Sequence, residues 1–465
     1  MTNDSNEPRS GRSRRYVDRR RFLAGSASAA TLTLLAGCAG GGGSGGSGGD
    51  SGSSGGDSGG SSGDSGGSSG GTTDTSGGSS ETITVGASAA LTGKYSVEGK
   101  ATAEGYELWA QQLNEEGSIL TDGDETGLLG REVEMVVYDD QSDPSRAVNL
   151  YKRLINEDDV DLMMGPYSSA VSTSVMPIIE QSQTACVMPM MSDTSVLTER
   201  DVNYIVQAIA PSSTYLKGAI DIGVENGAES VAIVYEDTAF PTSIAEGHVP
   251  YIEEKGLEIV HQSSYPKDIN DYTSVMNKVQ SSGADLAIGG AYTPDAIGLT
   301  TAAKSIGYSP GMMAWTVGTT APSFYDSVGG DALAVSGDLF WAPWFQVPYN
   351  EPTKQAITNF YDYDDLSNVD YHLVGGYAGT LVMEQAVRNV GSLDQAAIAE
   401  ELHSLEMGVP WGNGTYRVDD NGVQVGHAPS LGQWQEADGD GLTREAVWPS
   451  EYATDDPVYP HPGWS

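Results

Sequence analysis

The sequence is poor in cysteine, histidine and basic residues, and each shortage excludes a class of protein. Its 465 residues include two cysteines, which leaves no disulfide framework and no cysteine-based zinc finger. The six histidines are widely spaced, with no HxH or HExxH pair, so we expect no metal, no cofactor and no metalloenzyme. With 23 basic against 64 acidic residues, the formal charge is −41, which excludes a broad basic surface for nucleic acid.

The rest of the composition is that of a packed protein with several domains. Hydrophobic residues make up 38% of the chain and aromatic residues 8%, enough to fill a core. A chain of this length predicts two or three domain-sized units, because single cores stop growing well below it. No nucleophile–base set stands out in the globular part, so we do not expect an enzyme.

Residues 1–38 have the order of an export signal. Arginines lead into Arg19-Arg20-Arg21-Phe22-Leu23, a small-residue apolar run follows, and Leu35-Ala36-Gly37-Cys38 closes it. The apolar run of 13 residues falls short of the about 20 needed to span a bilayer. The segment resembles a twin-arginine signal that ends in a lipoprotein lipobox, and Cys38 is the predicted lipidated residue.

Residues 39–80 consist almost entirely of Gly, Ser, Asp and Thr. This composition predicts a disordered tether with a reach of roughly 35–40 Å, holding a globular body to a lipid at the outer face of the cytoplasmic membrane. Cleavage before Cys38 leaves 16 basic and 61 acidic residues, a charge of −45. Such a surface favours solubility in strong salt and indicates an extreme halophile, and we expect an archaeon. An ordinary acidic secreted protein is the alternative interpretation.

From residue 81 onward, strand-like and helix-like segments alternate. Predicted strands include 83–91, 132–139, 231–236 and 286–290, and predicted helices include 99–116, 144–156, 242–255, 294–306 and 371–389. Repeated βα units predict an α/β fold with parallel sheets that are covered by helices on both faces. Breaks near 208–213 and 341–348 divide the body into two lobes. The tail 437–465 is expected to be a surface extension, ordered in part.

The body, roughly residues 81–436, resembles the type I periplasmic solute-binding proteins of ABC importers, in the leucine/isoleucine/valine-binding branch. The similarity rests on short motifs in the family's order and spacing: Val85-Gly86-Ala87 with Leu91-Thr92-Gly93, Tyr138 to Pro144, Gly165-Pro166-Tyr167-Ser168-Ser169, Val328 to Ala332, and Tyr377-Ala378-Gly379. The resemblance implies two doubly wound lobes joined by a three-segment hinge. Lobe 1 then comprises 81–209 and 342–414, and lobe 2 comprises 210–341 and 415–436.

The expected site lies between the lobes, and its first part binds the negative end of a solute. Ser168 and Ser169 stand at the start of a predicted helix, where free N–H groups and the helix dipole favour an anion. A plain serine N-cap is the alternative interpretation. The resemblance adds Met190 and Ser192, which match a second contact segment after the fourth strand.

Aromatic residues form the second part of the expected site. The resemblance implies that Phe240 and Tyr292, from lobe 2, close over the solute, with Tyr377 a further aromatic near the cleft. For Tyr377, which lies on a predicted helix, packing in the core is an equally good interpretation.

The sequence departs from the family at one position. Where the branched-chain binders carry an acid for the ligand ammonium, this chain has Trp315-Thr316-Val317-Gly318-Thr319. Either Thr316 binds the ligand without charge, or another carboxylate replaces the acid. Glu98 is the candidate, although a solvated surface position is the alternative.

The resemblance therefore implies a monomeric receptor that delivers a branched-chain or other amino acid to an ABC permease and ATPase. Urea or a short amide as the ligand, and a role as a sensor for a membrane signalling partner, remain open alternatives.

Overall fold

The computed structural model describes residues 82–121, 125–361, 363, 365–437, 439 and 441–464. The predicted export signal, Cys38 and the tether lie outside the described residues. Within them, no helix combines the length and the apolar composition that are needed to cross a membrane.

The first lobe is built on a five-stranded parallel sheet. Its strands, in spatial order, are β2 (Val133–Asp139), β1 (Ile83–Ala89), β3 (Leu162–Met164), β4 (Cys186–Met188) and β5 (Ile205–Gln207). The last three strands are fully buried runs of apolar residues, apart from Gln207, as expected for parallel strands that are covered on both faces. The carboxyl ends of these strands lead into the loops that carry the predicted site.

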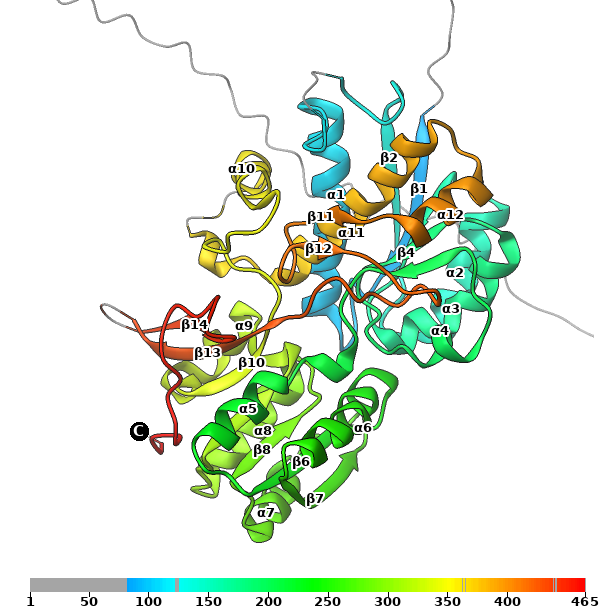
Figure 1. Ribbon diagram of the computed structural model, residues 1–465. Helices are drawn as coiled ribbons and strands as arrows, with labels where there is room; N and C mark the ends of the chain where they lie inside the picture. Colours follow the sequence, from blue (N-terminus) through cyan, green and yellow to red (C-terminus); the bar gives the residue numbers. More distant parts are fainter. Residues whose placement is uncertain are drawn as a thin grey trace, which may run out of the picture. The chain divides into compact units, whose positions relative to one another are not determined.

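The second lobe is built on a seven-stranded mixed sheet. In spatial order its strands are β14 (Leu442–Trp448), β13 (Ser430–Glu436), β10 (Val335–Leu339), β9 (Met312–Trp315), β8 (Leu286–Gly289), β6 (Ser230–Glu236) and β7 (Glu258–Tyr265). Strands β6 to β10 are parallel, and β13 and β14 are antiparallel additions beside β10 (Figure 1). The tail, which the sequence predicts to be a surface extension, thus supplies the edge strand β14.

Helices follow nearly every parallel strand, and the predicted α/β class with two lobes is confirmed. The α-helices are α1 (Ser96–Glu115), α2 (Pro144–Asn156), α3 (Ser169–Ser182), α4 (Ser195–Glu199), α5 (Lys217–Glu225), α6 (Ala239–Glu254), α7 (Thr273–Ser282), α8 (Thr293–Ser305), α9 (Pro322–Val328), α10 (Asn350–Phe360), α11 (Tyr371–Val390) and α12 (Gln395–Ser404). A small sheet pairs β11 (Met407–Gly408) with β12 (Thr415–Tyr416).

The chain passes between the two sheets three times. It leaves the first sheet after β5 and enters the second at β6, returns after β10 to α11, which packs on α1, and crosses again before β13. Neither lobe is therefore one continuous stretch of sequence.

Helices α1 and α11 pack closely, and this contact positions part of the site. A side chain at Gly105 would meet the carbonyl oxygen of Leu373 at 2.1 Å, and one at Gly376 would meet that of Thr102 at 2.3 Å. Further along both helices, the indole Nε1 of Trp109 donates to a carboxylate oxygen of Glu384 at 2.8 Å. The two helices therefore approach each other most closely around Gly105 and Gly376.

Candidate functional site

Ser168 and Ser169 stand at the start of α3, as the sequence predicts, but their hydroxyls differ. Ser168 is the N-cap residue, yet its side chain makes no capping hydrogen bond, and its buried Oγ has no partner within the described protein. Ser169 Oγ accepts hydrogen bonds from the N–H groups of Ser192 (3.1 Å) and Asp193 (3.2 Å). Ser168 is thus not an ordinary capping serine, whereas Ser169 holds the second contact segment in place.

The second contact segment is buried and fixed by its backbone. Met190 is 4% exposed and belongs to the hydrophobic core, and Ser192 is 2% exposed. The carbonyl oxygen of Ser192 accepts a hydrogen bond from the N–H of Ser212, which begins a short 3-10 helix in the segment that leads from β5 into lobe 2. Ser192 therefore lies where the two lobes join.

Phe240 and Tyr292 bring aromatic rings from lobe 2 to the same region. Their ring centroids are 5.5 Å apart, and the ring of Tyr292 lies 4.4 Å from that of Tyr95 and 6.2 Å from that of Tyr167 in lobe 1. The hydroxyl of Tyr292 is buried and has no hydrogen-bond partner in the described part of the chain. These rings place the predicted aromatic residues at the contact between the lobes.

Two predicted site residues have hydroxyls that are engaged elsewhere in the fold. Thr316 Oγ1 donates to the carbonyl oxygen of Ala291 (3.2 Å) and accepts from its N–H (3.0 Å). The hydroxyl of Tyr377 donates to Gln112 Oε1 at 3.0 Å, at the packing contact between α11 and α1. A ligand contact by either residue remains a prediction.

Glu98 lies in the first turn of α1 and is fully buried, so its side chain is not at the surface. Its Oε1 accepts hydrogen bonds from the N–H (2.9 Å) and hydroxyl (2.7 Å) of Thr293, the first residue of α8 in the other lobe. Burial raises the pKa of Glu98, while the charge of His372 and the bonds from Thr293 oppose that rise. Its second oxygen, Oε2, has no partner in the described structure.

Three ionisable residues beside Glu98 were missed by the sequence analysis. His372 Nδ1 lies 2.7 Å from Asp370 Oδ1 at the start of α11, and the charge of Asp370 raises the pKa of His372 although burial opposes it. Burial would raise the pKa of Asp370, but His372 holds it below its usual value. Asp338, at the end of β10, accepts from the hydroxyl of Tyr371 at 2.6 Å, and burial raises its pKa to about 7. The run Asp370-Tyr371-His372 at a helix start was the available signal.

Several buried polar atoms without partners gather around these residues. We call them the inner polar cluster: Glu98 Oε2, Ser168 Oγ, Tyr215 OH, Tyr292 OH and Asp338 Oδ1. Ring contacts bring residues of this cluster together, since the ring of Phe240 lies 5.9 Å from that of Tyr215 and 5.5 Å from that of Tyr292. Burial raises the pKa of Tyr292 and of Tyr215, with smaller contributions from the charges of Glu98 and Asp338 respectively. Since buried polar groups are normally hydrogen-bonded, such a group of atoms marks a place for a polar ligand or water.

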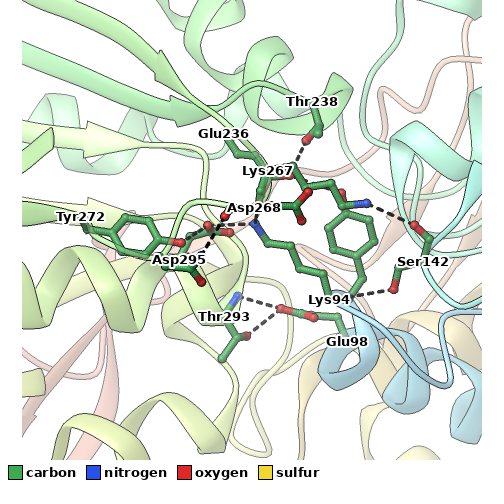
Figure 2. A network of polar contacts seen from close by, with 12 residues as sticks. Lys94, Glu98, Ser142, Glu236, Thr238, Lys267, Asp268, Tyr272, Thr293 and Asp295 are labelled. Atoms are coloured by element: carbon green, nitrogen blue, oxygen red, sulfur yellow. Dashed lines mark hydrogen bonds and ion pairs between the residues drawn. The ribbon is translucent and has the colours of Figure 1, made fainter. Parts of the chain in front are cut away.

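Beside this cluster, a network of charged residues connects the lobes (Figure 2). The Nζ of Lys94, just before α1, bonds Glu236, Asp295 Oδ1 (3.0 Å) and the carbonyl oxygen of Lys267 (2.6 Å), all in lobe 2. Lys267 Nζ in turn donates to the carbonyl oxygen of Ser142 at 3.2 Å. The side chains of Glu236 and Asp295 are fully buried, and burial together with the charge of Asp295 raises the pKa of Glu236.

The paired acids Asp139 and Asp140 hold loops, as expected for structural carboxylates. Asp139 accepts from the N–H and hydroxyl of Thr92, and Asp140 accepts from the hydroxyl of Ser88 and the N–H of Ser142. No group of three or more potential metal ligands occurs among the residues that the structure describes.

The Periplasmic binding protein family matches residues 82–440. Leu/Ile/Val-binding protein homolog 7 of Brucella abortus (strain 2308) is 23% identical over 370 residues, covering 76% of this chain and 89% of the relative.

Two solved structures illustrate the range of ligands among similar folds. One is a branched-chain amino acid transporter substrate binding protein from Streptococcus pneumoniae in complex with isoleucine (TM-score 0.66, 16% identity, covering 79% of this chain and 100% of that one). Another is a solute binding protein of an ABC transporter from Rhodopseudomonas palustris HaA2 in complex with p-hydroxybenzoic acid (TM-score 0.68, 20% identity, covering 83% and 99%). At these identities the likeness shows the fold alone.

The chain belongs to the periplasmic binding protein family. Members of this extracytoplasmic family are substrate-binding receptors and not enzymes.

Proposed function

We propose that this protein is a lipid-anchored receptor that captures an amino acid outside the cell and delivers it to an ABC permease and its ATPase. The observation that carries the proposal is the inner polar cluster, a set of buried hydroxyl and carboxylate oxygens from both lobes that have no partners in the described structure and lie beside the aromatic rings at the contact between the lobes. A free amino acid has a carboxylate and an ammonium, and both need partners when they leave water.

The hydroxyls of Ser168 and Tyr292 suit the carboxylate of such a ligand. Ser168 Oγ stands at the N-terminus of α3, where free N–H groups and the helix dipole attract negative charge, and it has no other partner in the described protein. The residues Met190, Ser192, Phe240, Thr316 and Tyr377 are proposed to shape the remainder of the site.

An aromatic carboxylate is the second candidate ligand. The rings of Tyr95, Tyr167, Phe240 and Tyr292 meet at the contact between the lobes, with centroid distances from 4.4 to 6.4 Å among the four. Such a lining suits a flat apolar ring, and one relative is described in complex with p-hydroxybenzoic acid.

A screen of thermal shifts tests the proposed function. The mature protein is mixed at high salt with each of the twenty amino acids, urea, acetamide, benzoate and 4-hydroxybenzoate. We expect one or a few related amino acids to raise the melting temperature, with a dissociation constant in the micromolar range or below by calorimetry. No shift with any of these solutes contradicts the proposal.

The lipid anchor is proposed from residues 1–80 of the sequence. The twin-arginine signal, the lipobox at Cys38 and the Gly/Ser/Asp tether support a lipid-anchored position at the outer face of the cytoplasmic membrane. The variant Cys38→Ser should move the protein from the membrane fraction to the medium, and the mature wild-type chain should carry an added lipid mass. Retention of the variant in the membrane contradicts the anchor.

The acidic composition supports the proposal that this protein functions in strong salt and comes from a haloarchaeon. With a charge of −45 after cleavage, self-repulsion is strong at low ionic strength and screened when salt is added. The melting temperature should therefore rise steadily between 0.1 and 3 M KCl, whereas a flat profile indicates an ordinary acidic secreted protein.

A further inference from the structure

The carboxylate of Glu98 lies between the lobes, and its two oxygens have different surroundings. Oε1 is held by the N–H and hydroxyl of Thr293, and both bonds are visible in Figure 2. Thr293 begins α8, a helix of 13 residues, so its N–H belongs to the helix end that favours negative charge. Oε2, fully buried in the same carboxylate, has no partner in the described structure and is left for a group that the protein itself does not supply.

The charges around Glu98 do not balance. Two buried carboxyls, Glu98 and Asp338, share neighbours with the partly buried carboxyl of Asp370. Two cationic side chains accompany them. His372 pairs with Asp370 at 2.7 Å, and the partly buried guanidinium of Arg444 is close to Asp370 while donating to two backbone carbonyls. With all five groups ionised, one negative charge would remain without compensation. Because an unpaired buried charge is costly, burial raises the pKa of Glu98 and Asp338 in the ligand-free protein, and a cationic group of a ligand would allow Glu98 to ionise.

Aromatic rings surround the same carboxylate. The hydroxyls of Tyr167 and Tyr292 lie near enough to Glu98 that its charge contributes to their raised pKa values, and the two ring centroids are 6.2 Å apart. The ring of His372 lies 5.3 Å from that of Tyr167. Faces of tyrosine rings attract cations, most strongly where water is excluded.

We infer that Glu98 Oε2 receives the ammonium group of the solute, so that the receptor takes compounds with a cationic amine and rejects plain carboxylates. This inference rests on the proposed function and narrows it, because it separates the amino acids from the aromatic acids. The acid comes from the first lobe, on α1, and replaces the missing acid near Thr316.

Closure of the lobes completes this ammonium site. Glu98 belongs to lobe 1, but the two donors that orient its carboxylate belong to Thr293 of lobe 2. When the lobes separate, Glu98 loses both donors and meets water. The oriented carboxylate therefore exists only in the closed form, and the binding of an ammonium group favours that form over the open one.

Matched ligands test the inference by calorimetry at high salt. The amino acid that binds most tightly is compared with its counterpart without the amine, for example L-isoleucine with 3-methylpentanoate or L-phenylalanine with 3-phenylpropanoate. Benzoate and 4-hydroxybenzoate are measured in parallel. We expect the amine-free counterpart to bind at least 100-fold more weakly than the amino acid, and the two benzoates to give no measurable heat.

The variant Glu98→Gln keeps the shape and the bonds to Thr293 but removes the charge. It should weaken the binding of the amino acid 10- to 100-fold and leave the amine-free compound unaffected or bound more tightly. Glu115→Gln is the matched control, since Glu115 lies on the same helix and is exposed, and it should change neither affinity. Thr293→Val, which removes one of the donors to Oε1, provides a second test, and we expect a 3- to 10-fold loss for the amino acid only.

The outcomes separate this inference from the proposed function. Tight binding of an amine-free carboxylate by the wild type, or equal affinity of wild type and Glu98→Gln for the amino acid, overturns the inference and leaves the receptor function standing. An absence of binding by every compound overturns the proposed function and the inference together. If Glu98→Gln does not fold, the Thr293→Val affinities and the matched ligands on the wild type decide.

Discussion

The ammonium of Lys94 lies 3.0 Å from Asp295 Oδ1, although the two residues belong to different lobes. The same ammonium bonds Glu236, and both acids are fully buried, so a single cation from lobe 1 compensates two carboxylates of lobe 2. This network holds the lobes together without a ligand, and part of the free energy of closure is therefore supplied by the protein itself.

Replacing Lys94 should open the ligand-free protein. Lys94→Met leaves Glu236 and Asp295 without their cation, and the loss of one partner from a buried pair costs about 3–5 kcal/mol if the remaining charge stays buried. Opening of the lobes lets water reach the acids, so we expect a larger radius of gyration by small-angle scattering and weaker ligand binding. Lys304→Met, which breaks an ion pair with Asp331 at a half-exposed site, is the control and should cost under about 1 kcal/mol. An unchanged radius and affinity for Lys94→Met would refute this role.

Ser168→Ala and Ser169→Ala should affect different properties, the first ligand binding and the second thermal stability. Ser168 Oγ bonds nothing in the described protein, so its removal should leave the melting temperature unchanged and weaken ligand binding by about 1–3 kcal/mol. Ser169 Oγ accepts two backbone N–H groups, and its removal should lower the melting temperature because these donors lose their partner. Thermal denaturation and calorimetry on both variants measure the difference. A destabilised Ser168→Ala with normal affinity would show that Ser168 serves the fold.

Asp338 should make the stability of the ligand-free protein depend on pH. Its pKa is raised to about 7 by burial, so the folded form keeps a proton that the unfolded chain loses at a lower pH. The free energy of unfolding therefore falls as the pH rises from about 4 to about 7, and it levels off above that. Glu98 and His372, whose pKa values are also raised, act in the same direction.

The variant Asp338→Asn isolates this effect. Asparagine can still accept the hydrogen bond from Tyr371 but has no proton to lose, so the melting temperature should fall less between pH 5 and pH 8 than in the wild type. At pH 8 the variant should be the more stable protein by about 1–4 kcal/mol. Parallel melting profiles of the two proteins would contradict the raised pKa.

The regular parts of the fold could be predicted because local signals and tertiary structure agree there. The predicted helix 144–156 has the observed bounds, with Pro144 in its first turn and Asp143 accepting from the N–H of Arg146. Strand β10 was missed because its sequence, Val-Ser-Gly-Asp-Leu, contains buried polar residues and gives no apolar run. Its Asp338 is tolerated only through the distant hydroxyl of Tyr371, which no local pattern reveals.

The candidate site was predictable only where a motif marks it. Ser168, Tyr292 and Phe240 follow strands or begin helices, and the family resemblance located them. Glu98 was singled out because an expected acid is missing, but its burial depends on Thr293, 195 residues further along the chain. The charge of Lys94 has meaning only through its distant partners Glu236 and Asp295, so periodicity could not indicate it. Asp370 and His372, in contrast, pair locally and offered a signal in the sequence.

The end of the chain should be essential for folding. Strand β14 lies along β13, and its Arg444 donates to the carbonyl oxygens of Thr320 and Ser367 while packing 5.8 Å from the ring of Trp434. Truncation after residue 441 removes these contacts and exposes β13 as an unpaired edge. We expect a loss of soluble protein or a fall in melting temperature of at least 10 °C. A truncated chain that melts as the full chain does would make residues 442–464 a dispensable extension.

The position of β14 also sets the order of events during synthesis. The second sheet receives β13 and β14 only after α11 and α12 have been made, so lobe 2 cannot be complete before these two strands leave the ribosome. The first lobe, too, waits for α11, which is made after most of lobe 2. Neither lobe can therefore be completed until most of the other has been made, and the growing chain carries two half-built sheets at once.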